Sequence, residues 1–403
     1  MENSKYIVGV DLGTTNCVVS YINSQTVDEY SIPASEIFKI SQVVDAGVVE
    51  ELEYLPSFLY LPLKDELPAK SIDLPFKQDV DYVTGVFAAL RGAKVPGRVV
   101  SSAKSWLCHA GVDRTSAILP WKGAEGVKQL SPLAVSSLYL EHMKDAWNYA
   151  VAKGDEQLML ENQDVYLTVP ASFDAIAREL TVKAANLAGF KHITLLEEPQ
   201  AAFYAWLNRL GEKWRKDVQV GDIILVCDIG GGTTDFSLIE VSDEGGNLVL
   251  KRIAVGDHIL LGGDNMDLTM AYEVQKKFAN DGVKLDSYQM LSLIHNCRQA
   301  KEKMLNDPSC QRHPVIIPGR GRKIVGKTLQ QELERQEVER VILDGFFPVS
   351  ELSEEPQKTR VAGFKELGLK YAADTAVTKY LSRFLRQNAE IPPKRSTPRN
   401  ISS

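Results

Sequence analysis

The chain has 403 residues, too many for one ordinary domain and suited to two. Hydrophobic residues make up 44% and charged residues 25%, which is typical of a soluble globular protein, and the net charge of −7 gives no support to nucleic-acid binding. The five cysteines are scattered without a Cys-x-x-Cys pair, which fits reduced cytoplasmic thiols and argues against a disulfide framework or a structural zinc. No apolar run approaches the roughly 20 residues that span a bilayer, and no signal peptide is seen, so we expect neither membrane contact nor export.

The first predicted element is a β-hairpin at residues 7–21. An apolar run leads to Asp11, a short glycine turn follows, and a second apolar run leaves the turn. The turn and its exit are formed by Gly13, Thr14, Thr15 and Asn16.

Residues 36–130 combine Pro and Gly with short apolar runs, so no regular pattern of elements is predicted there. Beyond them, apolar spacing predicts a helix over 131–153 and a strand over 164–169. We expect Ser172 to cap the next helix, which ends at Gly189.

Another helix is predicted from Pro199 to Gly211, because proline suits the first turn of a helix. Glu198 stands at its entrance, where the helix dipole alone would favour an acidic residue. For Lys104, in the irregular region, the alternative to a role in the site is a solvated lysine on a helix.

Residues 224–239 form a second predicted hairpin with the pattern of the first. Asp228 ends its apolar run, where it can hold Mg²⁺ through water, since Mg²⁺ keeps several waters and few carboxylates. Glycines lack a Cβ, so that backbone N–H groups can approach a phosphate, and threonine hydroxyls can donate to its oxygens. The turn residues are Gly230, Gly231, Gly232, Thr233 and Thr234.

Either hairpin by itself can be an ordinary glycine-rich turn. The repetition instead indicates two similar lobes, each presenting one hairpin to the same phosphate chain, with Asp11 and Asp228 on either side of one metal.

The last third of the chain predicts mostly helix. The elements are a strand at 248–255 and helices that begin at Ser287, at Thr328 with a capping box to Gln331 and an end at Asp344, and at Asp374. Residues 386–403 hold prolines and basic residues and are predicted to be disordered.

The two hairpins resemble the two phosphate motifs of the superfamily that contains actin, sugar kinases and heat-shock protein 70 (Hsp70). Residues 165–173, with Val-Pro-Ala-Ser-Phe, and residues 195–202, with Glu-Glu-Pro-Gln-Ala-Ala, resemble the ATPase domain of the Hsp70, or DnaK-type, chaperone family. This resemblance implies an α/β protein with the actin-like ATPase fold. Each of two lobes is then built on a ribonuclease-H-like mixed sheet with flanking helices, and a nucleotide lies in the cleft between them.

Under this resemblance, lobe I covers residues 1–221, with a variable upper part at about 36–130, and lobe II covers 222–385, with an upper part at about 264–326. The family continues with a strand and a Gly-Gly turn that closes over the adenosine. No such segment, and no peptide-binding domain, is recognised in the rest of this sequence, so we expect a truncated or degenerate nucleotide-binding domain.

The resemblance also implies a site for ATP or ADP with Mg²⁺. Lys104 and Glu198 would orient the attacking water, Asp228 and Thr233 would take part in hydrolysis, and Asp11 and Asp228 would hold the metal. The residues implied to contact the nucleotide are Asp11, Gly13, Thr14, Thr15, Asn16, Gly230, Gly231, Gly232, Thr233, Thr234, Gly262, Gly263 and Lys301.

One segment departs from the family pattern. Arg298 stands at an acidic position and Glu302 at the basic position that stacks on adenine, so that only Lys301 fits the adenosine-contacting helix.

The implied function is that of the ATP-binding and ATP-hydrolysing domain of an Hsp70-like chaperone in the cytoplasm. Its partners would be ATP and, beyond it, co-chaperones or nucleotide-exchange proteins, with no nucleic acid and no membrane. The alternatives are a non-catalytic or degenerate protein, an actin-like filament protein and a sugar kinase of the same superfamily.

Overall fold

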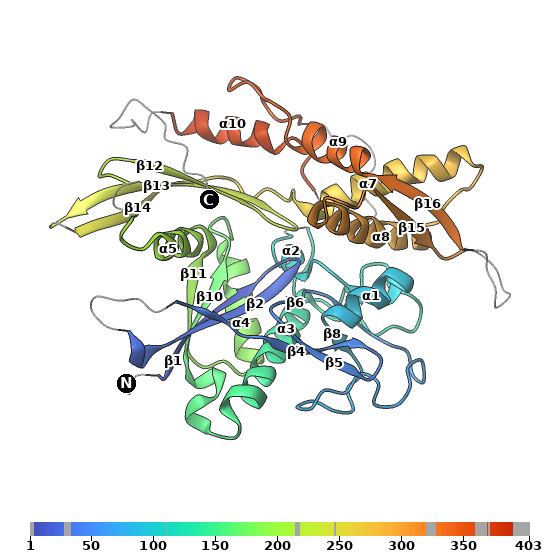
Figure 1. Cartoon of the computed structure of the whole chain (residues 1–403), viewed down its shortest axis with the longest axis horizontal. Coiled ribbons are helices and arrows are strands. Elements are labelled where there is room, and N and C mark those ends of the chain that lie inside the picture. Colours follow the sequence, from blue (N-terminus) through green and yellow to red (C-terminus); the bar gives the residue numbers. More distant parts are fainter. Residues whose placement is uncertain are drawn as a thin grey trace.

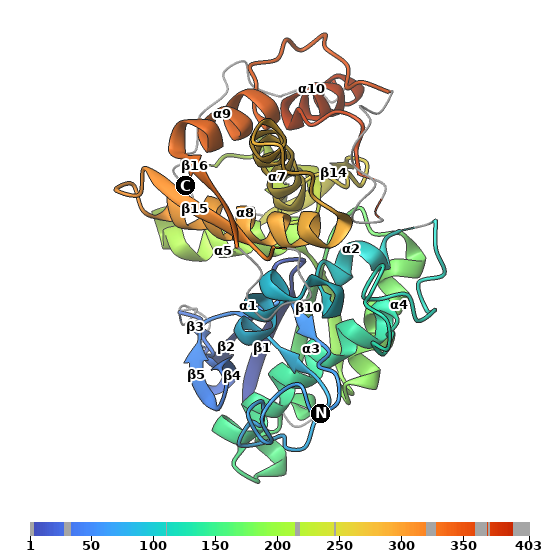
Figure 2. The same cartoon turned by 90° about the vertical axis from the view of Figure 1, so that its right-hand side faces the viewer.

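The structure is a computed structural model that describes residues 4–27, 34–109, 111–213, 218–245, 247–319, 328–358, 369 and 371–389. The chain folds into two lobes that lie one above the other in Figures 1 and 2, with the N-terminal lobe at the bottom. The tail predicted to be disordered covers residues 386–403, of which 390–403 lie outside the described residues; the prediction is wrong at residues 386 and 387, which end the helix α10 (Val377–Gln387). No helix in the described part of the chain is long and apolar enough to cross a membrane.

The lower lobe is built on a mixed sheet with the strand order β11-β10-β1-β2-β3. The first hairpin forms as predicted, because β1 and β2 pair antiparallel, while β10 and β11 run parallel to β1. The strands are β1 (Tyr6–Leu12), β2 (Asn16–Asn23), β3 (Glu36–Ile37), β10 (Asp164–Val169) and β11 (Ile193–Glu197), and β6 (Leu55–Pro56) also pairs with β2.

The lower lobe also contains the helices α3 (Pro132–Trp147), α4 (Ala175–Leu187) and α5 (Glu198–Leu210). Trp147 at the end of α3 is fully buried, and its ring meets the rings of Tyr6 and Tyr21 edge to face at 5.5 Å and 5.1 Å. Leu369 and Tyr371, from far along the chain, are buried in the same core. This core therefore anchors part of the C-terminal region to the lower lobe.

Residues 40–107 form short elements in place of a regular pattern, as the sequence suggested. They are β4 (Ile40–Asp45), β5 (Val48–Leu52), β7 (Leu59–Tyr60), β8 (Val83–Thr84), β9 (Val99–Val100), α1 (Val86–Lys94) and α2 (Ala103–Leu107). Single turns of 3₁₀ or π helix occur at η1 (Ser24–Thr26), η2 (Pro96–Arg98), η3 (Asn148–Ala152), η4 (Glu156–Leu158), η5 (Leu160–Asn162) and η6 (Gly211–Lys213).

The upper lobe contains the second hairpin and a separate core of packed side chains. Its three-stranded sheet, β12 (Ile223–Ile229), β13 (Thr234–Glu244) and β14 (Asn247–Val255), is antiparallel throughout. The remaining elements are α7 (Gly263–Asn280), α8 (Ser287–Asn306), β15 (Arg312–Ile317), β16 (Leu329–Glu334), α9 (Arg335–Phe346) and α10 (Val377–Gln387).

Two details of the sequence prediction are wrong. The helix expected to begin at Thr328 is a strand over its first part, because β16 pairs with β15, and the helix α9 begins only at Arg335. Its capping box is formed by Glu334 and Glu337. Ser172 does not cap α4, because the Asp174 carboxylate accepts the hydrogen bond from the Ala177 N–H at 2.6 Å.

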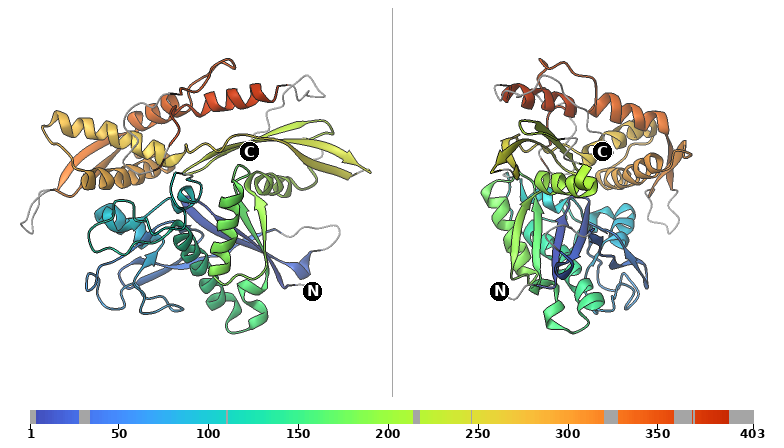
Figure 3. Two further views of the ribbon diagram at one scale, coloured as in Figure 1. Left: turned by 180° about the vertical axis from the view of Figure 1, so that it is seen from behind. Right: turned by 60° about the vertical axis from the view of Figure 1, so that its left-hand side comes forward.

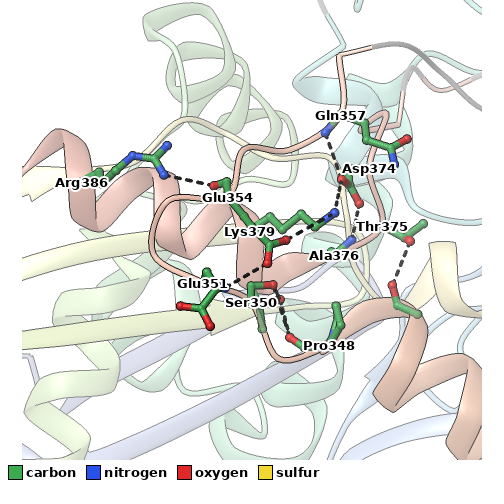
Figure 4. A network of polar contacts seen from close by, with 12 residues as sticks. Pro348, Ser350, Glu351, Glu354, Gln357, Asp374, Thr375, Ala376, Lys379 and Arg386 are labelled. Carbon is green, nitrogen blue, oxygen red and sulfur yellow. Dashed lines mark hydrogen bonds and ion pairs between the residues drawn. The ribbon is translucent and has the colours of Figure 1, made fainter.

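The start of α10 is fixed by polar contacts to the segment after α9, which Figure 4 shows from close by. The Asp374 carboxylate accepts hydrogen bonds at 3.0 Å from the N–H groups of both Gln357 and Ala376. Lys379 adds an ion pair at 3.4 Å. Burial works to raise the pKa of Asp374, but these partners outweigh burial and lower it. The contacts hold α10 against the upper lobe although the residues between 358 and 369 are not described.

Candidate functional site

The turns of the two hairpins meet where the two lobes face each other. A Cβ on Gly231 would overlap the Thr15 hydroxyl, and a Cβ on Gly232 would lie 2.8 Å from the Thr14 methyl group. Because a real Cβ is essentially never that close to another atom, these positions need glycine. The structure thus brings together the two predicted phosphate turns, which lie more than 200 residues apart in the sequence.

Two carboxylates stand at the ends of the strands that lead into these turns. Asp11 accepts a hydrogen bond from the Thr168 hydroxyl at 2.7 Å, so the end of β10 fixes its orientation. Asp228 lies directly opposite Asp235 in the β12–β13 pair. Burial, and then the nearby carboxylate of Asp235, raise the pKa of Asp228 above its ordinary value.

Lys104 and Glu198 form an ion pair beside the turns. The Lys104 Nζ lies 2.6 Å from the Glu198 Oε1, and their side chains are only 10% and 17% exposed. Lys104 comes from α2 and Glu198 from the first residue of α5, so the pair joins the irregular region of the lower lobe to its sheet. The expectation that both side chains lie near the phosphate turns fits this placement, and Lys104 is not a solvated lysine.

The pKa values of both side chains in this pair are shifted from their ordinary values. Burial opposes the charge of Lys104, but the carboxylates of Glu198 and Asp11 outweigh burial and raise its pKa. Burial raises the pKa of Glu198 to about 7, against the attraction of Lys104.

Gly262 and Gly263 adjoin the second turn at the start of α7. The Gly263 N–H donates to the Gly230 carbonyl oxygen at 3.1 Å, and the Asp264 N–H donates to the Gly231 carbonyl oxygen at 2.7 Å. A Cβ on Gly262 would lie 2.9 Å from the Gly231 carbonyl. The start of this helix is therefore fixed directly to the second phosphate turn.

Lys301 reaches the same region from α8, but it is already paired. Its Nζ lies 2.7 Å from the Asp267 Oδ1 and 3.3 Å from the Gly263 carbonyl oxygen. Arg298, one turn before it, donates through Nε to the Asp267 Oδ2 at 2.7 Å and also pairs with Asp264. Two cations of α8 and two carboxylates of α7 therefore neutralise each other in this cluster.

A contact between the lobes closes over this cluster. The Ser102 hydroxyl, from the lower lobe, donates to the Asp264 carboxylate at 2.5 Å. The Arg298 guanidinium lies 5.3 Å from the centre of the Phe58 ring, also in the lower lobe. Arg298, which stands where the family has an acidic residue, is thus paired with carboxylates and an aromatic ring and is not an isolated buried charge.

Sequence reasoning gave Asp235, Ser172 and His258 no role at the site, where they form a polar contact between the lobes. The Ser172 hydroxyl bonds Asp235 and lies 2.6 Å from His258 Nδ1, and His258 Nδ1 lies 3.5 Å from the Asp235 carboxylate. Asp235 is only 3% exposed. A signal was available, since Asp235 follows the Thr-Thr pair on the second hairpin and antiparallel pairing must place it across from Asp228.

The residues fit a nucleotide with Mg²⁺ in their chemistry. Glycines without room for a Cβ line the turns, hydroxyls and a lysine stand beside them, and Asp11 and Asp228 supply two carboxylates. Among the described residues, no group of three or more His, Cys, Asp or Glu could hold a metal alone. Mg²⁺ needs no such cage, because it is usually held by one or two carboxylates, waters and substrate phosphates. Because the turns touch, a phosphate chain between them requires the turns to move apart.

Comparison with known proteins agrees with this geometry. Residues 98–352 match the sequence model of the family described as Hsp70 protein. The HscA chaperone homologue of Shewanella baltica (strain OS155) is 26% identical over 325 residues, which cover 77% of this chain and 44% of that protein. The HscA homologue of Tolumonas auensis is 29% identical over 280 residues, covering 67% and 37%. The chaperone protein dnaK of Thalassiosira pseudonana is 26% identical over 345 residues, covering 84% and 50%. The chain thus spans half or less of the length of these relatives.

Proposed function

Because this chain belongs to the Hsp70 family, whose nucleotide-binding domain has the actin-like ATPase fold, we propose that it binds ATP or ADP with Mg²⁺ between its lobes and hydrolyses ATP. The observation that carries the proposal is the meeting of the two hairpin turns beside the buried pair of Lys104 and Glu198. The lobe boundaries near residue 221, and the upper parts at 36–130 and 264–326, belong to the same proposal.

Phosphoryl transfer to water needs mainly positioning and charge neutralisation, so no covalent nucleophile is required. Backbone N–H groups of Gly13, Gly231 and Gly232, and the hydroxyl of Thr233, hold the phosphates. Asp11 and Asp228 would hold Mg²⁺, which would supply positive charge to neutralise the phosphates.

Glu198 accepts a hydrogen bond from the attacking water and aligns it with the γ-phosphate. Lys104, held at 2.6 Å from Glu198, both fixes the carboxylate and offsets the negative charge that develops on the phosphate oxygens. Thr14, Thr15, Asn16 and Thr234 complete the contacts of the two turns.

The adenosine side contributes less to binding than the phosphate side in this proposal. Gly262, Gly263 and Lys301 lie next to the second turn, but Lys301 is paired with Asp267 and Glu302 replaces the basic residue expected beside adenine. Nucleotides that share a triphosphate should therefore bind with similar affinity.

Nothing specific in the matches or the structure favours a sugar kinase or an actin-like filament. Because the chain spans only part of its relatives, action on client proteins and contacts with co-chaperones or nucleotide-exchange proteins remain proposals for the larger assembly. A cytoplasmic location is proposed as well, since all five cysteines are free.

Calorimetric titration of the chain with Mg-ATP, Mg-ADP and Mg-GTP tests this proposal. Micromolar binding of all three, lost in Asp228→Asn and kept in Asp243→Asn on the same sheet, is expected. Absence of binding by a chain that still unfolds cooperatively would overturn it.

A further inference from the structure

One buried serine lies directly beside the second phosphate turn. Ser105 belongs to the short helix α2, which Figures 1 and 3 show at the top of the lower lobe, where it faces the upper lobe. A Cβ on Gly232 would overlap the Ser105 Oγ and would lie 3.4 Å from the Thr14 hydroxyl. Ser105 and Thr14 therefore approach the same glycine from the lower lobe, although they come from different elements.

The hydroxyl of Ser105 is buried and unpaired. The residue is 0% exposed, and no atom in the part of the chain that the structure describes forms a hydrogen bond with its Oγ. A buried hydroxyl in a helix commonly donates to the carbonyl four residues earlier, as Thr181 of α4 does to Ala177 at 2.8 Å. The position four residues before Ser105 lies outside α2 and does not take that role. Because buried polar groups are normally paired, this hydroxyl indicates a partner that is not part of the chain.

The surroundings of the hydroxyl define the chemistry of that partner. The two phosphate turns have to move apart before a phosphate chain can enter between them. The Ser105 hydroxyl, the Thr14 hydroxyl and the N–H of Gly232 then border the same space. All three can donate hydrogen bonds, and an anionic oxygen is the acceptor that three converging donors suit best. A phosphate oxygen can therefore be the partner of Ser105.

The position of Ser105 in the sequence indicates which phosphate this is. Ser105 directly follows Lys104, whose Nζ lies 2.6 Å from the Glu198 Oε1 in the pair proposed to align water with the γ-phosphate. Consecutive residues of a helix point about 100° apart. Lys104 can thus reach Glu198 while Ser105 reaches Gly232, and both side chains border the same end of the triphosphate.

We propose that the Ser105 hydroxyl donates a hydrogen bond to an oxygen of the γ-phosphate, and so contributes affinity for a nucleoside triphosphate that a diphosphate does not gain. This inference rests on the proposed function and adds to it one residue and one selectivity. The competing explanation is a small side chain that only lets the lobes pack closely at Gly232. Alanine would serve that purpose equally well, so substitution by alanine separates the two explanations.

The test compares the unsubstituted chain with Ser105→Ala by calorimetric titration with Mg-ATP and with Mg-ADP. Loss of a hydrogen bond to a charged group should weaken Mg-ATP binding about 10- to 100-fold and leave Mg-ADP binding within about twofold. The matched control is Ser71→Ala. Ser71 is 7% exposed and its Oγ has no partner among the described residues, but it lies between β7 and β8, where its carbonyl oxygen accepts from the Gly47 N–H at 2.7 Å. The control should change neither affinity.

Thermal unfolding without nucleotide checks the premise. Ser105→Ala should be at least as stable as the unsubstituted chain, because it removes an unpaired buried hydroxyl. A lower midpoint would show that the hydroxyl has a partner within the chain, and would overturn the proposal.

The titrations separate failure of this inference from failure of the ATP proposal. If the unsubstituted chain binds both nucleotides, then equal losses for Mg-ATP and Mg-ADP in Ser105→Ala, or no loss for either, would remove Ser105 from the site and leave ATP binding in place. An equal effect of Ser71→Ala on Mg-ATP would also overturn the inference. If the unsubstituted chain binds neither nucleotide, the proposed function fails and the role of Ser105 fails with it.

Discussion

The Nζ of Lys104 lies 2.6 Å from the Oε1 of Glu198, across 94 residues of sequence and beside both hairpin turns. Neither side chain could hold its charge at this depth without the other, since an isolated buried charge is strongly unfavourable. The pair is therefore preformed before any nucleotide binds, and its geometry can be tested through its effect on hydrolysis.

Replacing Lys104 by Ala should lower the single-turnover rate of ATP hydrolysis by about 10²- to 10³-fold, as is usual when one group that stabilises transition-state charge is lost. Binding of Mg-ATP should change much less, because the phosphate turns stay intact. Lys144→Ala is the matched control, since Lys144 is also poorly exposed, at 16%, and paired with Asp145 at 3.5 Å, yet lies on α3 away from the turns. Equal rates in Lys104→Ala and the unsubstituted chain would remove Lys104 from the mechanism.

Gly231→Ala should lower the thermal stability of the nucleotide-free chain, because the added Cβ overlaps the Thr15 hydroxyl where the two turns meet. The second substitution Thr15→Ala removes that hydroxyl and should restore part of the stability. Gly345→Ala, on α9 with no atom within 4 Å of the added Cβ, serves as control and should not destabilise the chain. Scanning calorimetry without nucleotide measures all three, and an unchanged midpoint in Gly231→Ala would show that the turns do not need to be this close.

The hairpins could be predicted from the sequence because their signal is local. An apolar run, an aspartate and a glycine turn fix a hairpin without help from distant residues, and the family resemblance then supplied the pairing of the lobes. The chain's membership of the Hsp70 family confirms the predicted fold class. Lys104 and Glu198, however, were placed near the turns only through that resemblance, since neither residue has a local pattern that reveals its partner.

The errors arose where distant contacts decide the local structure. Residues 329–334 are rich in Glu and Gln, which favour helix, but pairing with β15 makes them a strand in which Leu333 is buried at 2%. Ser172 has the residue type of a helix cap, yet its hydroxyl bonds Asp235, 63 residues away in the other lobe. In both places a contact with another part of the chain, within the upper lobe for β16 and between the lobes for Ser172, decided the local structure.

Arg298→Met should destabilise the upper lobe by about 3–5 kcal/mol, because it leaves the carboxylates of Asp264 and Asp267, only 3% and 1% exposed, with one cation fewer. Urea unfolding followed by circular dichroism measures the loss. The control is Lys128→Met in the exposed pair with Asp81, where side chains are 61% and 70% exposed and a change of at most about 1 kcal/mol is expected. A loss in Arg298→Met no larger than in the control would mean that the acidic pair is stabilised by Lys301 alone.

His142 should make the lower lobe less stable in acid. Its Nε2 donates to the Ser41 carbonyl oxygen at 2.9 Å and its Nδ1 accepts from the Thr84 hydroxyl at 2.7 Å, so the neutral ring is fully satisfied. Burial lowers the pKa of His142 from 6.5 to about 4; the Ser41 carbonyl and Glu141 oppose this shift, and Lys77 adds to it. Because the folded pKa lies below the unfolded one, this stabilisation is complete above about pH 6.5 and is lost as the pH falls toward 4.

At about 1.4 kcal/mol per pH unit, the His142 contribution to this loss is about 3 kcal/mol. His142→Gln keeps a donor and an acceptor but cannot take up a proton, so its free energy of unfolding should fall less between pH 7 and pH 4 than that of the unsubstituted chain. Urea unfolding followed by tryptophan fluorescence, read as the difference between the two chains at each pH, cancels the other titrating groups. Parallel pH profiles would show that His142 is protonated in the folded protein, and would contradict the hydrogen bonding described for its ring.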